Sequence, residues 1–584
     1  MLKNLAKAVR EYKGSSIASA VLVAFEVVME CLIPFVAASL IAEIEKACRL
    51  PVVIGYGVLL ILLACVSLTF GALAGRFCAT ASCGFAKNLR HDLFARVQSF
   101  SFENIDNFSS ASLVTRLTTD VANVQMAYMM LIRVAIRSPL MLIFALVMSF
   151  IMGGPMAFIF VAVVPVLAFG LIMVIRLTLP LFRRVFRRYD KLNESVEENI
   201  AGARVVKSFV REDYETEKFD REAKSVSADF TRAEKILAFN GPLMQMCLYA
   251  VMVCTLFFGA RAIISTPAEL AFFDVGKLSA FLTYGFQILM SLMMVSMIFV
   301  MMTLSAESAK RISEVLTAVP TVASPENALT EVKNGDITFE NVSFRYSKTA
   351  ERFALSDVDL SIRSGETVGI LGGTGSSKTT LVQLISRLYD VSEGRVLVGG
   401  EDVRRYDLTV LRSEVAMVLQ KNILFSGTIK ENLRWGKPDA TDEELKAVCR
   451  MACADEFIDT LPEGYDTYIE QGGTNVSGGQ KQRLCIARAL LARPKILILD
   501  DSTSAVDTKT DAKIRAAFAS YIPETTKIII AQRVASVMEA DKIVMLDGGR
   551  ITAIGTHEEL LSSSDLYREI YESQCHTGEE GGDR

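Results

Sequence analysis

Six long apolar runs occupy the first half of this 584-residue chain and restrict its fold more than any other feature. A membrane-spanning helix needs about 20 apolar residues, because each residue advances 1.5 Å across roughly 30 Å of hydrocarbon. None of the runs alternates with the period of two that the strands of a β-barrel show. The sequence therefore predicts an all-α six-helix transmembrane domain, with spans over residues 16–41, 52–74, 131–151, 156–177, 236–263 and 277–304.

The connections after the second and fourth spans are longer than the others and carry many basic side chains. These include Lys87, Arg90, Arg96, Arg183, Arg184, Arg187 and Arg188. Because cytoplasmic loops are enriched in lysine and arginine, both connections and both termini are predicted to be cytoplasmic, in a multi-pass protein of the cell membrane. Residues 1–14 carry charges of both signs without a cleavage-site pattern, which predicts an interfacial elbow helix on the lipid bilayer.

The second half of the chain has a different residue pattern. From about Glu331, short β-branched runs alternate with helical segments and Gly-rich turns, which predicts a soluble α/β domain. The predicted boundaries are a transmembrane domain over 15–314, a linker over 315–334, a soluble domain over 335–575 and a disordered tail over 576–584. A formal net charge of −4 gives no electrostatic case for a nucleic-acid partner.

A Gly-rich loop follows the apolar strand that begins at Val368 and opens a helix at Lys378. Such a loop binds phosphate: backbone N–H groups point at the anion, Lys378 reaches the terminal phosphates and Thr379 offers a hydroxyl to Mg²⁺. The strict pattern has glycine where Ser377 stands, and a β-carbon there strains the loop. The predicted ATP-binding residues of this loop are Gly372, Gly373, Thr374, Gly375, Ser376, Ser377, Lys378, Thr379 and Thr380.

Two further motifs complete a nucleotide site. The apolar run 495–501 ends in Asp500, a Mg²⁺ ligand by type, and Asp501, which would face the attacking water. Between the two motifs lie Ser477, Gly478, Gly479 and Gln480, directly before a helical run. On this order of motifs the sequence resembles the ATP-binding cassette (ABC) family, whose signature loop reads Leu-Ser-Gly-Gly-Gln and here begins with Val476.

The resemblance covers nearly the whole chain and implies a half-transporter of exporter type. It implies a P-loop NTPase domain with an α-helical signature subdomain, and a signature loop that closes over ATP on a second subunit. Tyr346 would stack on adenine, Gln420 would contact Mg²⁺, and Asp507, in the loop from Ser504, would link the two nucleotide sites. The segments 102–120 and 199–209 resemble the two intracellular loops of these exporters.

Two positions depart from the family pattern. Asp501 stands where competent cassettes have glutamate, so its oxygens fall about 1.5 Å short, a displacement that can cost roughly a hundredfold in rate. Gln532 stands where the family has its switch histidine, and glutamine cannot carry a proton. Together with the nearly intact signature, the two changes predict the degenerate-site half of a heterodimer whose partner supplies the consensus residues.

The membrane half holds two candidate features of a substrate pathway. Glu26 and Glu30 lie one helical turn apart in the first span, where carboxylates either contact a cationic or amphipathic substrate or lie near the outer mouth and touch water. The sixth span carries Gln287, Met290 and Met294 among further methionines, which suit a polyspecific pathway or ordinary helix packing.

The resulting prediction is an ATP-driven exporter subunit that moves hydrophobic or amphipathic small molecules, of multidrug type, out of the cytoplasm by alternating access. Lipid or peptide export is the alternative within the class, and a nucleotide-gated channel is the alternative class. The six spans and the signature loop exclude a soluble P-loop kinase or GTPase.

Overall fold

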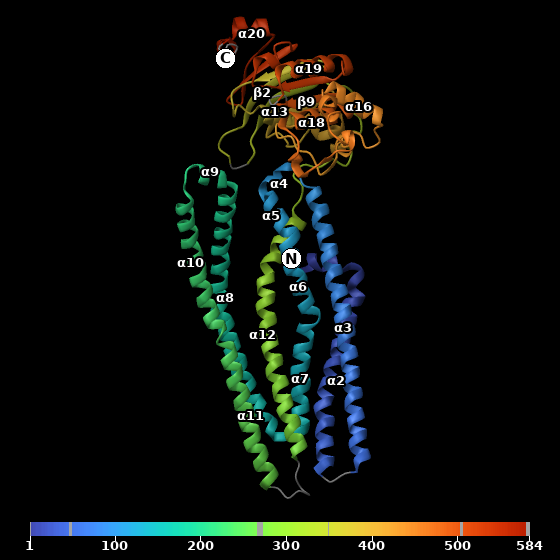
Figure 1. Ribbon diagram of the computed structural model, residues 1–584, viewed down its shortest axis with the longest axis vertical. Coiled ribbons are helices and arrows are strands. Elements are labelled where there is room, and N and C mark those ends of the chain that lie inside the picture. The colour runs from blue at the N-terminus through green and yellow to red at the C-terminus, as the bar shows by residue number, and fades with distance from the viewer. Residues whose placement is uncertain (1, 46–48, 266–272, 348–349, 503–505, 580–584) are drawn as a thin grey trace. The chain divides into compact units, whose positions relative to one another are not determined.

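The computed structural model describes residues 2–45, 49–265, 273–347, 350–502 and 506–579. The chain forms two compact units, Met1–Gln98 with Ser109–Ala318 and Ser99–Phe108 with Val319–Arg584. We call them the helical unit and the nucleotide unit (Figure 1). Ser504 lies outside the described residues, as do the side chains of Arg183 and Arg187.

The helical unit contains only helices among its described residues. They are α1 (Leu2–Ala6), η1 (Lys7–Tyr12), α2 (Lys13–Glu45), α3 (Leu50–Gln98), α5 (Ser110–Thr115), η2 (Arg116–Asp120), α6 (Val121–Ile132), α7 (Val134–Gly153), η3 (Gly154–Ala157), α8 (Phe158–Ala201), α9 (Ala203–Ser208), α10 (Glu212–Leu237), α11 (Asn240–Ser265) and α12 (Val275–Thr317). Helix α12 begins where it does because the Asp274 carboxylate caps it, accepting a hydrogen bond from the Lys277 N–H at 2.6 Å.

Five helical stretches are long and apolar enough to cross a membrane: Asn4–Glu45, Leu50–Gln98, Ser110–Phe182, Glu212–Ile264 and Val275–Thr317. The 73-residue stretch contains both the third and the fourth predicted spans, because the chain turns between α7 and α8 at η3. Gly154 permits this turn with φ of 51° and ψ of −124°, a conformation that suits glycine. The prediction of an all-α membrane domain is therefore confirmed, and its six spans correspond to α2, α3, α7, α8, α11 and α12.

The nucleotide unit mixes strands and helices, as expected for an α/β domain. Its strands are β1 (Ile337–Phe344), β2 (Leu355–Ile362), β3 (Thr367–Leu371), β4 (Glu393–Val398), β5 (Glu401–Asp402), β6 (Val415–Val418), β7 (Gly427–Thr428), β8 (Tyr468–Ile469), β9 (Ile496–Asp500), β10 (Thr526–Ile530), β11 (Lys542–Asp547) and β12 (Arg550–Gly555). Its α-helices are α4 (Phe102–Phe108), α13 (Lys378–Ile385), α14 (Leu408–Glu414), α15 (Ile429–Leu433), α16 (Asp442–Met451), α17 (Asp455–Ile458), α18 (Gly478–Leu491), α19 (Thr508–Tyr521), α20 (His557–Ser563) and α21 (Asp565–Glu579).

The main sheet has six strands in the order β12-β11-β3-β10-β9-β6. Strands β11, β3, β10, β9 and β6 are parallel, and β12 is an antiparallel edge strand. A second sheet, β2-β1-β4-β5, is antiparallel. Helices α15 to α18 are inserted between β6 and β9, and share a buried core in which Leu445, Ile458 and Leu484 are at most 1% exposed.

Three details differ from the predicted boundaries. Residues 99–108 belong to the nucleotide unit, because Asn104 of α4 accepts a hydrogen bond from the Thr321 N–H at 3.2 Å and donates to the Val319 carbonyl at 3.3 Å. Helix α12 extends to Thr317, three residues into the predicted linker, since Val315 is buried at 1% exposure. Helix α21 extends to Glu579, four residues into the predicted tail, whose last five residues lie outside the described part.

Candidate functional site

Three loops meet at the carboxyl ends of the central parallel strands. Strand β10 lies between β3 and β9, and its Ile530 is in register with both Ile370 and Asp500. The Gly-rich loop after β3, Asp501 after β9 and Gln532 after β10 therefore emerge side by side from the same edge of the sheet. Ligands of open α/β sheets bind at this edge.

The loop after β3 has the geometry of a phosphate cradle. Gly375 has φ of 82° and Ser377 has φ of 71°, so both lie in the left-handed region. A residue with a β-carbon costs about 1–2 kcal/mol in that region, which explains why glycine is the usual residue where Ser377 stands. Lys378 Nζ donates hydrogen bonds to the carbonyl oxygens of Gly372 and Gly373 at 2.9 and 2.8 Å, and burial lowers its pKa.

The residues beside the cradle fit a Mg²⁺ ion. Asp500 is 2% exposed, and its Oδ2 is buried without a hydrogen-bond partner among the described residues. Burial raises the pKa of Asp500 and the neighbouring Asp501 charge acts in the same direction, whereas the Thr379 hydroxyl, which hydrogen-bonds Asp500, opposes the shift. A buried carboxylate oxygen and a hydroxyl are ligand types that Mg²⁺ prefers, and the ion would neutralise phosphate charge there.

The two residues that depart from the ABC pattern are hydrogen-bonded to each other. Gln532 Nε2 donates to Asp501 Oδ2 at 2.9 Å, and Gln420 Nε2 donates to the same oxygen at 3.4 Å. Two amide donors therefore occupy the carboxylate oxygen that would have to receive a proton from an attacking water. Asp501 itself has φ of 50°, a left-handed conformation that directs its short side chain toward these amides.

Tyr346 and α4 are joined through a residue that the sequence did not single out, Tyr389. The Tyr346 ring is 48% exposed, and its hydroxyl pairs with Thr380 Oγ1 at 2.8 Å. The rings of Tyr346 and Tyr389 meet edge to face with centroids 5.3 Å apart, and the Tyr389 hydroxyl donates to Asp106 of α4 at 2.7 Å. Burial raises the pKa of Tyr389, and the adjacent Asp106 adds to the shift. An isolated tyrosine 43 residues after Tyr346 carries no sequence signal for this contact.

The signature residues form the N-terminus of α18. Ser477 is the N-cap and makes a reciprocal capping box with Gln480: the Ser477 N–H donates to Gln480 Oε1 at 2.8 Å, and the Gln480 N–H donates to Ser477 Oγ at 3.3 Å. The partial positive charge at this helix N-terminus suits an anion. Asp507 is the N-cap of α19 and accepts a hydrogen bond from the Thr510 N–H at 2.9 Å. Hydrogen bonds from the Thr510 side chain and from this N–H lower the pKa of Asp507.

The loop that carries Gln532 is held by Gln574 of α21, a second residue without a sequence signal. Gln574 Nε2 donates to the Gln532 carbonyl at 2.9 Å, and Gln574 Oε1 accepts from the Val534 N–H at 2.8 Å. One amide therefore bonds the backbone on both sides of Arg533. Because Val534 is 1% exposed, water cannot replace the lost acceptor without local opening.

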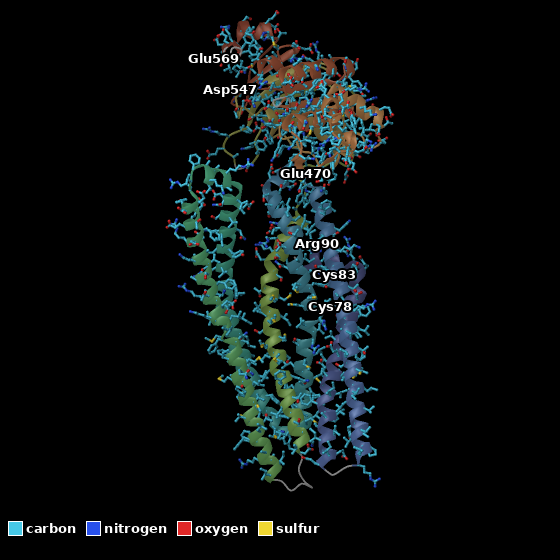
Figure 2. The ribbon with its side chains drawn as sticks, viewed as in Figure 1. Cys78, Cys83, Arg90, Glu470, Asp547 and Glu569 are labelled. Carbon is cyan, nitrogen blue, oxygen red and sulfur yellow. The ribbon has the colours of Figure 1, made fainter. Side chains whose placement is uncertain are left out.

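Replacing Gln574 with leucine is expected to weaken the loop by about 1–3 kcal/mol, the cost of leaving a buried N–H unpaired. Hydrogen exchange of the Val534 amide measures this directly and should accelerate on the order of tenfold or more. Glu569→Leu on the same helix is the matched control (Glu569 is labelled in Figure 2). Glu569 is exposed and has no hydrogen bond or ion pair in the described part of the chain. Equal exchange in both variants would contradict the role of Gln574.

In the helical unit, the two carboxylates of the first span are bound by Arg137 of α7. Arg137 NH1 donates to Glu26 Oε1, and NH2 donates to both oxygens of Glu30 at 2.8 and 2.7 Å. The Glu26 side chain is 7% exposed, so it does not face water as one interpretation required, and Glu30 is 26% exposed. The two carboxylates share this one cation of the chain, and the contact of Glu26 and Glu30 with a cationic or amphipathic substrate stays a prediction.

Gln287, Met290 and Met294 of α12 line one cavity together with α3, α6 and α7. Met293, Met297 and Met301 line a different cavity of about 420 Å³ against α8 and the start of α11. The methionines of the sixth span therefore line two different cavities beside α12, and their role in a substrate pathway stays a prediction.

Comparison with known proteins agrees with this geometry. Residues 16–293 match the ABC transporter transmembrane region, and residues 355–504 match the ABC transporter family. The chain is 37% identical over 528 residues to the ABC transporter ATP-binding protein YfiB of Bacillus subtilis, covering 90% of each chain. It is 32% identical over 489 residues to the ATP-dependent lipid A-core flippase of Desulfotalea psychrophila, covering 84% of each.

The fold matches that of a bacterial Atm1-family ABC exporter solved with ATP bound, with a TM-score of 0.82, 24% identity and coverage of 97% of this chain and 98% of the other. At that identity the likeness concerns the fold. Together with the matched families, the cradle and the six spans, it leads to one assignment. The chain belongs to the ABC transporter family, as a membrane protein of exporter fold whose ATP-binding domain couples ATP hydrolysis to transport.

Proposed function

We propose that this chain is one half of a heterodimeric ABC exporter, and that its own nucleotide site holds ATP with little hydrolysis. The observation that carries the proposal is the hydrogen bond between Gln532 and Asp501. The two departures from the family pattern satisfy each other's polar groups, as expected of residues retained together. If the catalytic base and the switch histidine had been lost independently, a hydrogen bond between their two replacements would not be expected.

In this proposal the signature loop completes the site of the partner half. ATP bound to the partner's cradle meets Ser477 and the N-terminus of α18, while the partner supplies the glutamate and histidine that this chain lacks. The cradle of this chain binds ATP with Mg²⁺ near Thr379 and Asp500, and Tyr346 stacks on the adenine. The nucleotide unit and the N-terminus lie in the cytoplasm, and hydrophobic or amphipathic small molecules are moved outward.

Helix α4 transmits the ATP-dependent closure. It is held by Thr321 and Tyr389 of the nucleotide unit, yet the chain continues directly from α3 before it and into α5 after it. A displacement of the nucleotide unit is therefore applied to two helices of the helical unit through the covalent chain. Hydrolysis at the partner's site then resets the cycle.

The test is restoration of the consensus residues. The purified full chain alone is expected to hydrolyse ATP weakly, and the Asp501→Glu, Gln532→His double variant to gain at least about tenfold. Because the two side chains are hydrogen-bonded to each other, the increase in hydrolysis rate of the double variant should exceed the product of the increases of the two single variants. The corresponding coupling free energy is about 0.5 kcal/mol or more. Strong hydrolysis by the unmodified chain alone would contradict a degenerate site.

Lipid export is the second candidate, since one relative is a lipid A-core flippase. Vesicles distinguish the two: a multidrug exporter moves soluble amphipathic dyes on addition of ATP, whereas a flippase moves labelled lipid between leaflets and leaves the dyes in place.

A further inference from the structure

The cavity beside α12 is the strongest candidate for a ligand site in the helical unit. It measures about 700 Å³ and lies between α3, α6, α7 and α12. Cys78 of α3, which is labelled in Figure 2, belongs to its lining. That volume lies within the range of small-molecule sites, about 300–1,000 Å³. Its apolar lining includes Met129, Met130, Met141, Met290, Met294 and Phe286. Methionine adapts to irregular apolar shapes, so this wall suits a flexible hydrocarbon.

The charged side chains in the lining are both arginines, Arg133 and Arg137. Arg137 is already paired with Glu26 and Glu30, and neither carboxylate is part of the lining. Arg133 has no ion pair or side-chain hydrogen bond among the described residues. Among the described lining residues, the charged group without a counter-ion is therefore Arg133, a cation, whereas the two glutamates of the first span had indicated a cationic ligand.

The backbone places Arg133 for such a role. It lies at the break between α6 and α7, with φ of −116° and ψ of −66°. Its guanidinium NH1 approaches Gly75 of α3 so closely that a β-carbon there would lie 3.3 Å away. Gly75 thus leaves room for the guanidinium within the cavity wall. An arginine within a spanning region is costly unless it finds an anion or water, which makes Arg133 a functional candidate.

A second polar group in the wall also lacks a partner. Gln287 Oε1 is buried with no hydrogen-bond partner in the described part of the chain. A buried amide oxygen without a donor costs about 1–3 kcal/mol, and a ligand hydroxyl or N–H removes that cost. Arg133, between α6 and α7, thus offers a donor, and Gln287 on α12 offers an acceptor, both beside an apolar wall.

We propose that this cavity binds an amphipathic anion. The acidic group, a carboxylate, sulfonate or phosphate, accepts hydrogen bonds from Arg133. A hydroxyl or N–H of the ligand donates to Gln287 Oε1, and its hydrocarbon part lies against the methionines and Phe286. Glu26 and Glu30 hold the Arg137 guanidinium in place, and neither carboxylate contacts the ligand. The assignment rests on the proposed export function and gives it a substrate class.

The experiment compares two fluorescent probes that share one dye and one dodecyl chain, ending in a sulfonate or a trimethylammonium group. The full chain is placed in nanodiscs of zwitterionic phosphatidylcholine without nucleotide, and probe affinities are measured. We expect the sulfonate to bind at least about tenfold more tightly than the ammonium. Arg133→Gln should lower sulfonate affinity about tenfold and leave the ammonium probe unchanged or improved, whereas Arg133→Lys should retain most of the affinity.

Arg176→Gln is the charge-matched control, because Arg176 is an exposed arginine of α8 outside the cavity lining. Thr178→Val tests the other methionine-lined cavity and should also leave sulfonate binding unchanged. Equal affinities for the two probes, preference for the ammonium, or no effect of Arg133→Gln would overturn the anion assignment. Export itself is judged separately, by ATP-dependent movement of either probe in vesicles.

A competition measurement in the same nanodiscs distinguishes an anionic lipid from a soluble amphiphile as the ligand. If phosphatidylglycerol in the nanodisc competes with the sulfonate probe, the ligand is an anionic lipid. If it does not compete, the ligand is a soluble amphiphile. Either result supports an anion site, since both require the same cation at Arg133.

Discussion

Replacing Ser477 with alanine is expected to lower ATP hydrolysis by the assembled transporter about a hundredfold, the usual effect of removing one donor from a charge-stabilising site. Ser477 Oγ both caps α18 and, in the proposed heterodimer, contacts the phosphate bound to the partner. Lys378→Ala, which disables this chain's own cradle, should have a smaller effect because that site contributes little hydrolysis. The ATPase rates of the two variants, each assembled with the intact partner, measure how much of the hydrolysis occurs at the partner's site.

A matched control separates the catalytic role of Ser477 from its structural one. Thr556 forms the same kind of capping box with Glu559 at the start of α20, away from the signature. Thr556→Ala should cost about 1 kcal/mol of stability and leave hydrolysis nearly unchanged. If Lys378→Ala abolished hydrolysis as completely as Ser477→Ala, the division of labour between two halves would be wrong.

Replacing Arg311 with methionine is expected to destabilise the helical unit by about 3–5 kcal/mol, because it leaves a fully buried carboxylate unpaired. Asp120, at the end of η2, has 0% exposure and accepts hydrogen bonds from Arg311 Nε, at 2.8 Å, and from Arg311 NH2. The pair joins α12 to the segment that follows α5. A fall in melting temperature on the order of 10 °C should follow in detergent or nanodiscs.

The neighbouring Lys310 supplies the control for this prediction. It belongs to the same helix and pairs with Glu307 at 4.0 Å, with both side chains more than 60% exposed. Lys310→Met should change stability by no more than about 1 kcal/mol. The double variant Asp120→Leu with Arg311→Met should recover much of the loss, since replacing a buried pair by apolar groups is often neutral. Equal effects of the two methionine variants would show that the pair does not anchor α12.

The features read correctly from the sequence are those encoded locally. A run of apolar residues specifies a spanning helix wherever it occurs, so the six spans follow from composition alone. The strand before Gly372, the loop and the helix opening at Lys378 follow from neighbours within a dozen residues. The capping box of Ser477 and Gln480 is likewise a relation between residues three apart.

Contacts between residues far apart in the chain could not be predicted from the sequence. Arg137 interrupts the third apolar run, and it lies more than 100 residues after Glu26 and Glu30, the two glutamates that share its guanidinium. Tyr389 and Gln574 carry no motif, and their roles arise from α4 and α21 packing against the nucleotide unit. Ser504 remains outside the described residues, so the loop before Asp507 stays a prediction.

Local patterning was enough to establish that this chain spans a membrane and binds ATP, because helix period, glycine spacing and capping act over a few residues. Packing decided which charge faces the membrane cavity and which groups occupy the oxygens of Asp501. Those outcomes depend on the register between helices and strands far apart in the chain, where a one-residue shift directs a side chain to a different face. The polarity of the cavity, positive at Arg133 despite two glutamates nearby, is a property of the folded arrangement.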